Sequence, residues 1–353
     1  TTVSSTVNAF LVPHIKMLIN DDNIVDCAFN INKPLDEELI NLGVNSYNIP
    51  FSRKPLGIGN IKAFNEIIRL QRLKKYDIIH VHTPVAALYV RLLKIIFPKV
   101  KIIYTAHGYH FLEGGSKLGW LVYYPIEKVM AKLTDVIINI NEEDYEITKN
   151  KLKPKNCYLI NGVGLDLSIY KKLSEEEILE KKNELGINKN DFVILMIAEL
   201  NKNKNHEIII RVLSKLTNKN FIYLICGNGE LKEYLKNLAK ELGVSDKVKF
   251  LGYRKDVLEI YKIADLFLFP SKREGLPCSL IEAMACGLPC VASDVRGNKD
   301  LLRSDNLCKS NKEEEWLRLL NKAFCEKILV NELQDIYGVS HIKKNMQDIY
   351  GLN

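Results

Sequence analysis

The chain has 353 residues, more than one hydrophobic core usually organises, so two domains are expected. It is 47% hydrophobic and 26% charged, as globular proteins usually are, and no apolar run approaches the roughly 20 residues of a membrane span. The formal net charge of +7 favours anionic ligands or an anionic membrane face, and no nucleic-acid partner is expected.

The cysteines and the first residues indicate the compartment. Eight cysteines are scattered without a Cys-x-x-Cys pair, which is typical of reduced, buried thiols. No charged n-region with a following apolar h-region is present, so no secretion signal is predicted. These features favour a cytoplasmic protein, either free or peripheral at the inner face of the plasma membrane.

In chain order, the first predicted elements are a turn and a helix in TTVSSTVNAFLVPHIKML (1–18). A doubly wound domain normally begins with a central strand, so we expect that a few natural residues precede Thr1. Short β-rich runs then alternate with amphipathic helices. The strands predicted in this half of the chain are 76–82, 101–106, 135–140 and 157–160.

The segment EGGSKLGWLVYYPIEKVMAKL (113–133) lies between two of these strands. It groups Trp120, Tyr123 and Tyr124 with several lysines, among them Lys117. An aromatic patch bordered by lysines suits a surface that touches anionic lipid. A buried helix of the N-terminal domain explains the same tyrosines, so both interpretations stay open.

After a polar segment at 171–191 the alternation of strands and helices restarts. The strands predicted here are 192–198, 221–226, 247–252, 265–270 and 289–293. Near-continuous apolar strands between helices are typical of parallel sheets covered on both faces. The two series predict two doubly wound α/β domains. We place an N-terminal domain at 1–165, with a C-terminal helix at 338–353 packing back on it, and a C-terminal domain at 166–337.

The stretch SKREGLPCSLIEAMACGLPCVASD (271–294) carries two glutamates, Glu274 and Glu282, eight positions apart. Ligands of open parallel sheets bind at the carboxyl ends of the strands, and the strand at 265–270 ends here. Backbone amides at the start of the next helix, near Cys278 or Ser279, predict an anion site. Two carboxylates beside it would accept hydroxyls, which together describes a nucleotide-sugar. An acidic helix start that favours the helix dipole is the simpler alternative.

The Glu-x7-Glu arrangement in EGLPCSLIEAMACGLPCVASD resembles the signature of the retaining GT-B glycosyltransferases of family 4. The likeness covers nearly the whole chain and is nearest to bacterial capsule and exopolysaccharide transferases. Four further segments carry it: TAHGYHF (105–111), NGVGLD (161–166), AELNKNKNH (198–206) and FLGYRKDV (250–257). The resemblance implies a GT-B fold, in which two doubly wound Rossmann-like domains face each other across a cleft.

The resemblance also implies roles for individual residues. Glu282 would bind the ribose hydroxyls, and Glu274 would hold the donor sugar. Lys204 matches the lysine that neutralises the diphosphate, and His107 the histidine that reaches the sugar. The remaining donor-binding candidates are the amides of Gly275 and Leu276, the adjacent Pro277, the base-side residues Tyr253 and Arg254, the close-approach glycine Gly227, and Glu199.

Two positions depart from the family pattern. An arginine usually stands five residues before the diphosphate lysine, and this chain has Glu199, which cannot clamp a diphosphate. Either Lys202 compensates, or Glu199 pairs with Lys204 and orients it. The glycine pair of the acceptor loop is also absent. The acceptor-side candidates are Ser4, Ser5 and Thr6, which stand in its place, together with His82 and His110.

The sequence contains no Asp-x-Asp motif, so we expect a metal-independent reaction without cofactor, in which Lys204 and helix amides carry the charge. The resemblance implies retaining transfer of a hexose or N-acetylhexosamine-type sugar, with UDP favoured as the carrier. The acceptor would be a lipid-linked sugar or oligosaccharide in bacterial surface polysaccharide synthesis. The alternatives are a nucleotide-sugar 2-epimerase of the same fold and a non-catalytic partner subunit. An NAD-dependent oxidoreductase is disfavoured, because no Gly-x-Gly-x-x-Gly follows an early strand.

Overall fold

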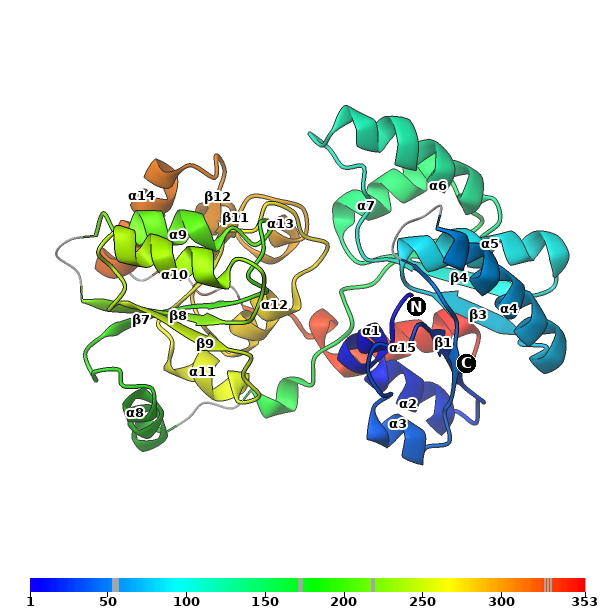
Figure 1. The fold of residues 1–353 in the computed structure, drawn as a ribbon, viewed down its shortest axis with the longest axis horizontal. Helices are drawn as coiled ribbons and strands as arrows, with labels where there is room; N and C mark the ends of the chain where they lie inside the picture. The colour runs from blue at the N-terminus through cyan, green and yellow to red at the C-terminus, as the bar shows by residue number, and fades with distance from the viewer. Residues whose placement is uncertain are drawn as a thin grey trace. The chain divides into compact units, whose positions relative to one another are not determined.

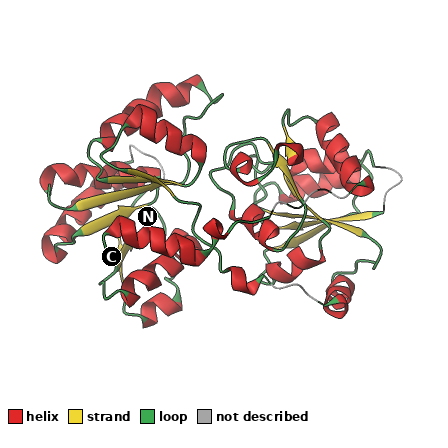
Figure 2. Cartoon of the chain, turned by 180° about the vertical axis from the view of Figure 1, so that it is seen from behind, coloured by secondary structure: helices red, strands yellow, loops and turns green. Residues whose placement is uncertain are grey.

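The computed structural model describes residues 1–52, 57–170, 174–216, 220–326, 328, 330 and 332–352. The chain divides into two compact units, which are described separately (Figure 1). Unit 1 comprises Thr1–Gly164 and Ile336–Asn353, and unit 2 comprises Leu165–Asp335. Both contain parallel sheets with helices packed beside them (Figure 2).

Unit 1 has two parallel sheets. A four-stranded sheet runs in chain order through β3 (Ile78–Val81), β4 (Lys101–Ala106), β5 (Val136–Asn139) and β6 (Cys157–Leu159). These strands confirm the four predicted in this half. A separate pair, β1 (Asp26–Phe29) and β2 (Asn45–Asn48), was not predicted. The sequence of β2, NSYN, is polar and mostly exposed, so it carries no apolar signal.

The helices of unit 1 follow from local signals. Pro84 occupies the first position of its helix, where its missing amide costs nothing, and Gly351 ends the last helix with a φ of 81°. The helices are α1 (Ser4–Phe10), α2 (Val12–Asn20), α3 (Glu37–Asn41), α4 (Ile58–Lys74), α5 (Pro84–Ile96), α6 (Tyr124–Ala131), α7 (Glu142–Ile147) and α15 (Val339–Tyr350), with π-helical turns η1 (Gly119–Tyr123) and η2 (Thr148–Leu152).

The C-terminal helix α15 belongs to the core of unit 1. Ile342 and Met346 pack with Ile103 of β4 and Ile138 of β5. The phenol of Tyr350 lies 2.5 Å from His80 Nδ1, so the last helix also contacts the end of β3 through a polar bond. Burial of this apolar face stabilises the helix far more than its intrinsic propensity does.

Unit 2 has one parallel sheet of six strands in the order β12-β11-β10-β7-β8-β9. The strands are β7 (Phe192–Ile197), β8 (Phe221–Cys226), β9 (Val248–Gly252), β10 (Leu266–Phe269), β11 (Cys290–Ser293) and β12 (Leu307–Cys308). Counted within the unit and read from β9, this is 3-2-1-4-5-6, the order of the doubly wound fold. Five strands were predicted, and the two-residue β12 was not.

The helices of unit 2 cover both faces of this sheet. Helices α9, α10 and α14 lie on one face, and α11 and α12 lie on the other (Figure 1). Ser174 and Glu177 form a capping box at the start of α8. The helices are α8 (Glu175–Glu184), α9 (His206–Leu213), α10 (Lys232–Glu241), α11 (Val257–Ile263), α12 (Cys278–Ala285), α13 (Asn298–Leu301) and α14 (Glu313–Cys325), with short 3₁₀ turns η3 (Leu167–Ile169), η4 (Ser304–Asn306) and η5 (Asp335–Tyr337).

Candidate functional site

The strand order of unit 2 reverses between β7 and β10, which are neighbours in the sheet. Loops that leave the carboxyl ends of two such strands turn in opposite directions and open a crevice between them. Here these loops are 198–205 after β7 and 270–277 after β10. The first carries Lys204 and the second carries Glu274, so the topology alone brings these two candidates together.

Backbone and amide hydrogen bonds join the two loops. The Lys272 amide donates to the Asn203 carbonyl at 2.8 Å, and Asn203 Nδ2 donates back to the Arg273 carbonyl at 2.9 Å. Asn205 Nδ2 donates to the Pro270 carbonyl at 3.3 Å. Because these hydrogen bonds hold both loops at several points, the backbone positions from which the Lys204 and Glu274 side chains extend are restrained.

Lys204 and Glu274 form an ion pair across the crevice. Lys204 Nζ lies 2.6 Å from Glu274 Oε1, and the two side chains are only 22% and 10% exposed. The ammonium group also lies 4.8 Å from the centroid of the Phe269 ring. At this position the lysine can bind an anion such as a diphosphate, and the glutamate can accept hydrogen bonds from hydroxyl groups.

The interpretation that Glu199 pairs with Lys204 is wrong. Glu199 is exposed, and its Oε2 accepts a hydrogen bond from Asn201 Nδ2 at 3.0 Å, whereas Lys204 pairs with Glu274. Glu199 is therefore turned toward its own loop. Lys202, the alternative second cation, is exposed in the same loop.

Helix α12 begins directly after the Glu274 loop, with Pro277 at its N-cap position. The amides of Cys278 and Ser279 have no carbonyl one turn earlier within the helix, so they are free to bind an anion. Glu282 follows one turn later. Burial raises the pKa of its carboxyl, while a hydrogen bond from Tyr261 acts in the opposite direction.

The loop between Glu274 and α12 is braced from the end of β11. Arg296 Nε donates to the Glu274 carbonyl at 3.0 Å. Gly297, at a φ of 79°, lies so close that a Cβ there would sit 2.1 Å from the Gly275 carbonyl oxygen. Leu276 is 9% exposed and anchors the loop in the core.

The other donor-side candidates differ in their surroundings. A Cβ at Gly227, whose φ is 148°, would lie 2.0 Å from the carbonyl oxygen of Ala198. The ends of β7 and β8 therefore pack so closely here that the position requires glycine, whether or not a ligand binds. Tyr253 is 77% exposed. The Arg254 guanidinium is held by Asp256, at 2.5 Å and 2.8 Å, so its charge is already paired.

Unit 1 gathers His80, His82 and His107 near the carboxyl ends of β3 and β4, and His14 of α2 lines the same cavity. The rings of His80 and His82 lie 4.1 Å apart, and His82 Nδ1 lies 3.4 Å from His107 Nε2. Burial lowers the pKa of His107 to about 4 and that of His80 to about 3, and it lowers the pKa of His82 and His14 as well. These imidazoles are neutral at pH 7, so each can donate one hydrogen bond and accept another.

These histidines line a cavity of about 710 Å³ within unit 1. Its walls include β1 and β3 and the end of the C-terminal helix at Tyr350. His107, which the family resemblance matches to the histidine that reaches the sugar, and His82, an acceptor-side candidate, therefore line the same cavity.

The remaining acceptor-side candidates lie at two places in unit 1. Ser4 is fully buried, and its hydroxyl donates to the Lys33 carbonyl at 2.6 Å, so it serves the fold. Ser5 and Thr6, in the same turn of α1, are partly exposed. His110 is exposed, and its ring stacks on Tyr123 at 4.8 Å between centroids.

The segment 113–133 is divided between core and surface. For Trp120 and Tyr124 the buried-helix interpretation is favoured, because both are partly buried and pack against the core of unit 1, and Trp120 Nε1 donates to the Leu112 carbonyl at 3.0 Å. We call the apolar side chains that do face outward the α6 patch. They are Leu118, Leu121, Val122, Tyr123, Ile126 and Val129, which are 39% to 75% exposed.

Two residues of the site were not predicted from the sequence. Tyr261 occupies an apolar position of the amphipathic helix α11 and is indistinguishable from a core residue until its hydroxyl contact is seen. Arg296 follows the predicted strand 289–293, so its position after a strand end was the available clue.

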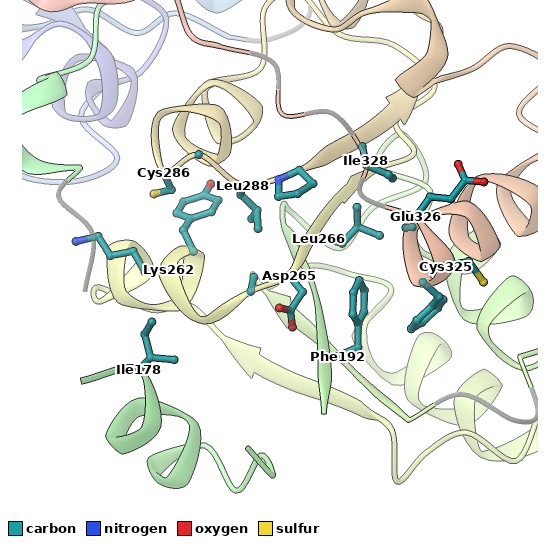
Figure 3. Close-up of a pocket in the computed structure, with 16 residues that line it drawn as sticks. Ile178, Phe192, Lys262, Asp265, Leu266, Cys286, Leu288, Cys325, Glu326 and Ile328 are labelled. Atoms are coloured by element: carbon teal, nitrogen blue, oxygen red, sulfur yellow. The ribbon is translucent and has the colours of Figure 1, made fainter. Parts of the chain in front are cut away.

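A second cavity, of about 620 Å³, lies at the other end of unit 2 (Figure 3). Phe192 and Leu266, the first residues of β7 and β10, line it together with Leu288 and Ile328. Its floor is therefore at the amino-terminal edge of the sheet, away from the Lys204–Glu274 pair, although Tyr261 and Cys286 also line it.

Two kinds of feature are absent from the described ranges. No group of three or more His, Cys, Asp and Glu residues there is arranged to hold a metal ion. No helix in those ranges is long and apolar enough to cross a membrane.

Each of the two units matches a known glycosyltransferase family. Residues 177–336 match the family described as Glycosyl transferases group 1, and residues 3–141 match the family described as Glycosyl transferase 4-like. EpsD of Bacillus subtilis (strain 168), assigned as a glycosyltransferase, is 34% identical over 262 residues, which are 73% of this chain and 69% of that protein. These matches confirm the resemblance predicted from the Glu-x7-Glu stretch.

Two further comparisons extend over nearly the whole chain. The Escherichia coli UDP-Gal:alpha-D-GlcNAc-diphosphoundecaprenol alpha-1,3-galactosyltransferase is 27% identical over 337 residues, 92% of this chain and 86% of that enzyme. The crystal structure of Anabaena HepE with UDP and glucose superposes with a TM-score of 0.76 at 19% identity, covering 96% of this chain and 95% of that one. The GT-B fold class predicted from the sequence is confirmed.

Proposed function

The chain belongs to the glycosyl transferases group 1 family, and we propose that it is a retaining, metal-independent enzyme of bacterial surface polysaccharide synthesis. It is a glycosyltransferase. The finer proposal is transfer of a hexose or N-acetylhexosamine-type sugar from a UDP-linked donor to a lipid-linked sugar or oligosaccharide. The ion pair of Lys204 with Glu274 at the switch point carries this proposal.

Each group in the crevice has a role in the proposed reaction. Lys204 and the first amides of α12 would stabilise the negative charge that develops on the departing diphosphate. Glu274 would hold sugar hydroxyls, and Glu282 would hold the ribose diol. The acceptor attacks the anomeric carbon on the face from which the diphosphate leaves, and a phosphate oxygen takes its proton. No protein nucleophile is needed.

The comparisons support the choice of donor and acceptor. The name of the Escherichia coli relative gives UDP-galactose as donor and a diphosphoundecaprenol-linked sugar as acceptor. HepE was crystallised with UDP. By this analogy we assign UDP as the carrier and a lipid-linked sugar as the acceptor.

A lipid-linked acceptor requires access to a membrane surface, and the α6 patch supplies a contact face. Leu121 is 75% exposed and Val129 57%, and lysines stand around them, with Lys117 exposed before η1. Exposed apolar side chains beside cations match the composition of interfacial helices that bind anionic lipid. We assign this face to peripheral contact with the inner leaflet.

The membrane assignment is tested by co-sedimentation with vesicles of phosphatidylglycerol and phosphatidylcholine. Leu121→Ser should weaken binding, while Leu73→Ser, which alters a 69% exposed leucine on α4, should not. If both variants and the wild type bind equally, the acceptor is reached without this face.

The catalytic assignment is tested by release of nucleoside diphosphate from UDP-, GDP-, ADP- and dTDP-sugars. Release should depend on a diphosphoundecaprenol-linked sugar and persist in excess EDTA, and the anomeric configuration of the product should match that of the donor. Activity that disappears with EDTA and returns with Mg²⁺ would overturn metal independence. Interconversion of UDP-sugars without acceptor would instead indicate the epimerase.

A further inference from the structure

We propose that Tyr261 is a positioning residue that fixes the carboxylate of Glu282 for the nucleotide ribose. This inference rests on the proposed function, because it takes Glu282 as the group that binds the ribose diol. Tyr261 itself would not touch the nucleotide. It would act through the orientation and the charge of the glutamate.

The contact between the two side chains is direct. Tyr261 lies on α11 and Glu282 on α12, and the phenol oxygen is 2.9 Å from Glu282 Oε2. The same oxygen is 2.9 Å from the Ser279 carbonyl, one turn earlier in α12. The phenol proton therefore lies between two acceptors of one helix, and the hydroxyl is tied to both.

The tyrosine is itself immobilised. It is 1% exposed, and its ring packs against Phe267, a fully buried residue of β10, with 5.7 Å between ring centroids. A phenol held in this way has one accessible position for its oxygen. The carboxylate that it contacts is therefore restrained at Oε2.

Because Tyr261 holds the Glu282 carboxylate at Oε2, the other oxygen, Oε1, is left to accept a hydrogen bond from a ligand. Among the residues that the structure describes, Glu282 Oε1 has no hydrogen-bond partner, and Glu282 stands one turn after the first amides of α12. A vicinal diol needs acceptors in a set direction. Pre-orienting the carboxylate removes the cost of ordering it when the nucleotide binds.

The tyrosine also favours the charged form of the glutamate. Burial raises the pKa of Glu282, and the hydrogen bond from Tyr261 lowers it. Tyr170, Cys278 and Cys286 also face this carboxyl, and burial raises the pKa of each, so they stay neutral from pH 5 to 8. These three neighbours therefore add no charge beside Glu282 in that range.

Isothermal calorimetry on Tyr261→Phe tests the proposal, with UDP and 2′,3′-dideoxyuridine 5′-diphosphate as probes. UDP affinity should fall roughly three- to tenfold, while affinity for the dideoxy probe should not change. Loss of the hydrogen bond raises the pKa of Glu282, so UDP affinity should decline at a higher pH than in the wild type as the solution is acidified. A role in packing alone would weaken both probes equally and leave the pH profile in place, which would overturn the proposal.

Two further variants separate the inference from the function on which it rests. Tyr223→Phe removes another buried phenol of unit 2, one that contacts Met196 Sδ at 3.3 Å, and should bind UDP like the wild type. Glu282→Gln should weaken UDP at least as much as Tyr261→Phe, and the double variant should be little worse than Glu282→Gln. If Glu282→Gln weakens UDP but Tyr261→Phe does not, only the role of Tyr261 is overturned. If Glu282→Gln binds UDP normally, the donor site itself is misassigned.

Discussion

At the scale of single residues, the crevice of unit 2 contains charges that neutralise one another until a ligand arrives. Lys204 and Glu274 are 70 positions apart in sequence, yet their charged atoms lie 2.6 Å apart. A diphosphate would compete with Glu274 for the lysine, and sugar hydroxyls would compete with Lys204 for the glutamate. The pair therefore keeps both side chains in the crevice and ready to exchange partners.

Lys204→Ala should slow sugar transfer, because it removes at least about 2 kcal/mol of transition-state stabilisation. This is the order observed on removing one preorganised charge-stabilising donor. The measurement is kcat/KM for release of nucleoside diphosphate. The matched control is Lys202→Ala, an exposed lysine of the same loop, which should be nearly normal. An equal loss in both variants would show that Lys202 shares the charge role in place of the missing arginine.

Glu282→Gln and Glu274→Gln should separate two functions of the crevice. Glu282→Gln should weaken free UDP by about ten- to hundredfold, because a hydrogen bond to a charged group contributes roughly 1.5–3 kcal/mol. Glu274→Gln should leave UDP affinity nearly intact and lower the turnover of the intact donor. Calorimetry with UDP beside transfer rates distinguishes them. If both variants bind UDP and transfer sugar like the wild type, the two carboxylates only interact favourably with the helix dipole.

At the scale of elements, the sequence predicted what depends on local pattern. The strand FVILMI of β7 is a continuous apolar run and was recognisable, whereas β1, β2 and β12 are short or polar and gain their pairing only from neighbouring strands. Glu274 and Glu282 stand in one motif and could be found together. The partner of Lys204 could not, because it depends on how two distant loops meet.

Helices α5 and α6 are joined by an ion pair inside unit 1. Arg91 is 0% exposed at its side chain, and its guanidinium donates to both carboxylate oxygens of Glu127, at 2.7 Å and 2.9 Å. It also lies 4.5 Å over the Tyr104 ring. This pair sets the position of α6, which carries the apolar patch assigned to the membrane.

Glu127→Gln should lower the free energy of unfolding of unit 1 by about 3 kcal/mol, because removing one partner leaves a buried charge uncompensated. The chain has two tryptophans, so a Trp316→Phe background leaves Trp120 in unit 1 as the only fluorescent reporter during urea denaturation. Glu66→Gln is the control, since its pair with Arg69 on α4 is exposed and should contribute little. Equal effects of the two substitutions would show that the buried pair is not what holds α6.

At the scale of the whole molecule, the two units differ in the number of histidines whose pKa is lowered by burial. Unit 1 holds His14, His80, His82 and His107, whose pKa values burial lowers, while unit 2 has one such residue, His206. A histidine with a lowered folded pKa binds a proton more readily when the chain is unfolded. Its contribution to stability is complete above the unfolded pKa of about 6.5 and is lost as the pH falls.

Acidification from pH 7 to pH 5 should therefore destabilise unit 1 more than unit 2. Each cluster histidine with a folded pKa near 4 or below costs about 1 to 2 kcal/mol by pH 5. Unit 2 has an opposing contribution, because burial raises the pKa of Asp265 and of Glu282, and a raised carboxyl pKa favours the folded state as the pH falls. Urea denaturation at the two pH values, with Trp120 or Trp316 as sole reporter, measures each unit by itself. A drop of equal size in both units would show that the histidine cluster does not control the acid sensitivity of unit 1.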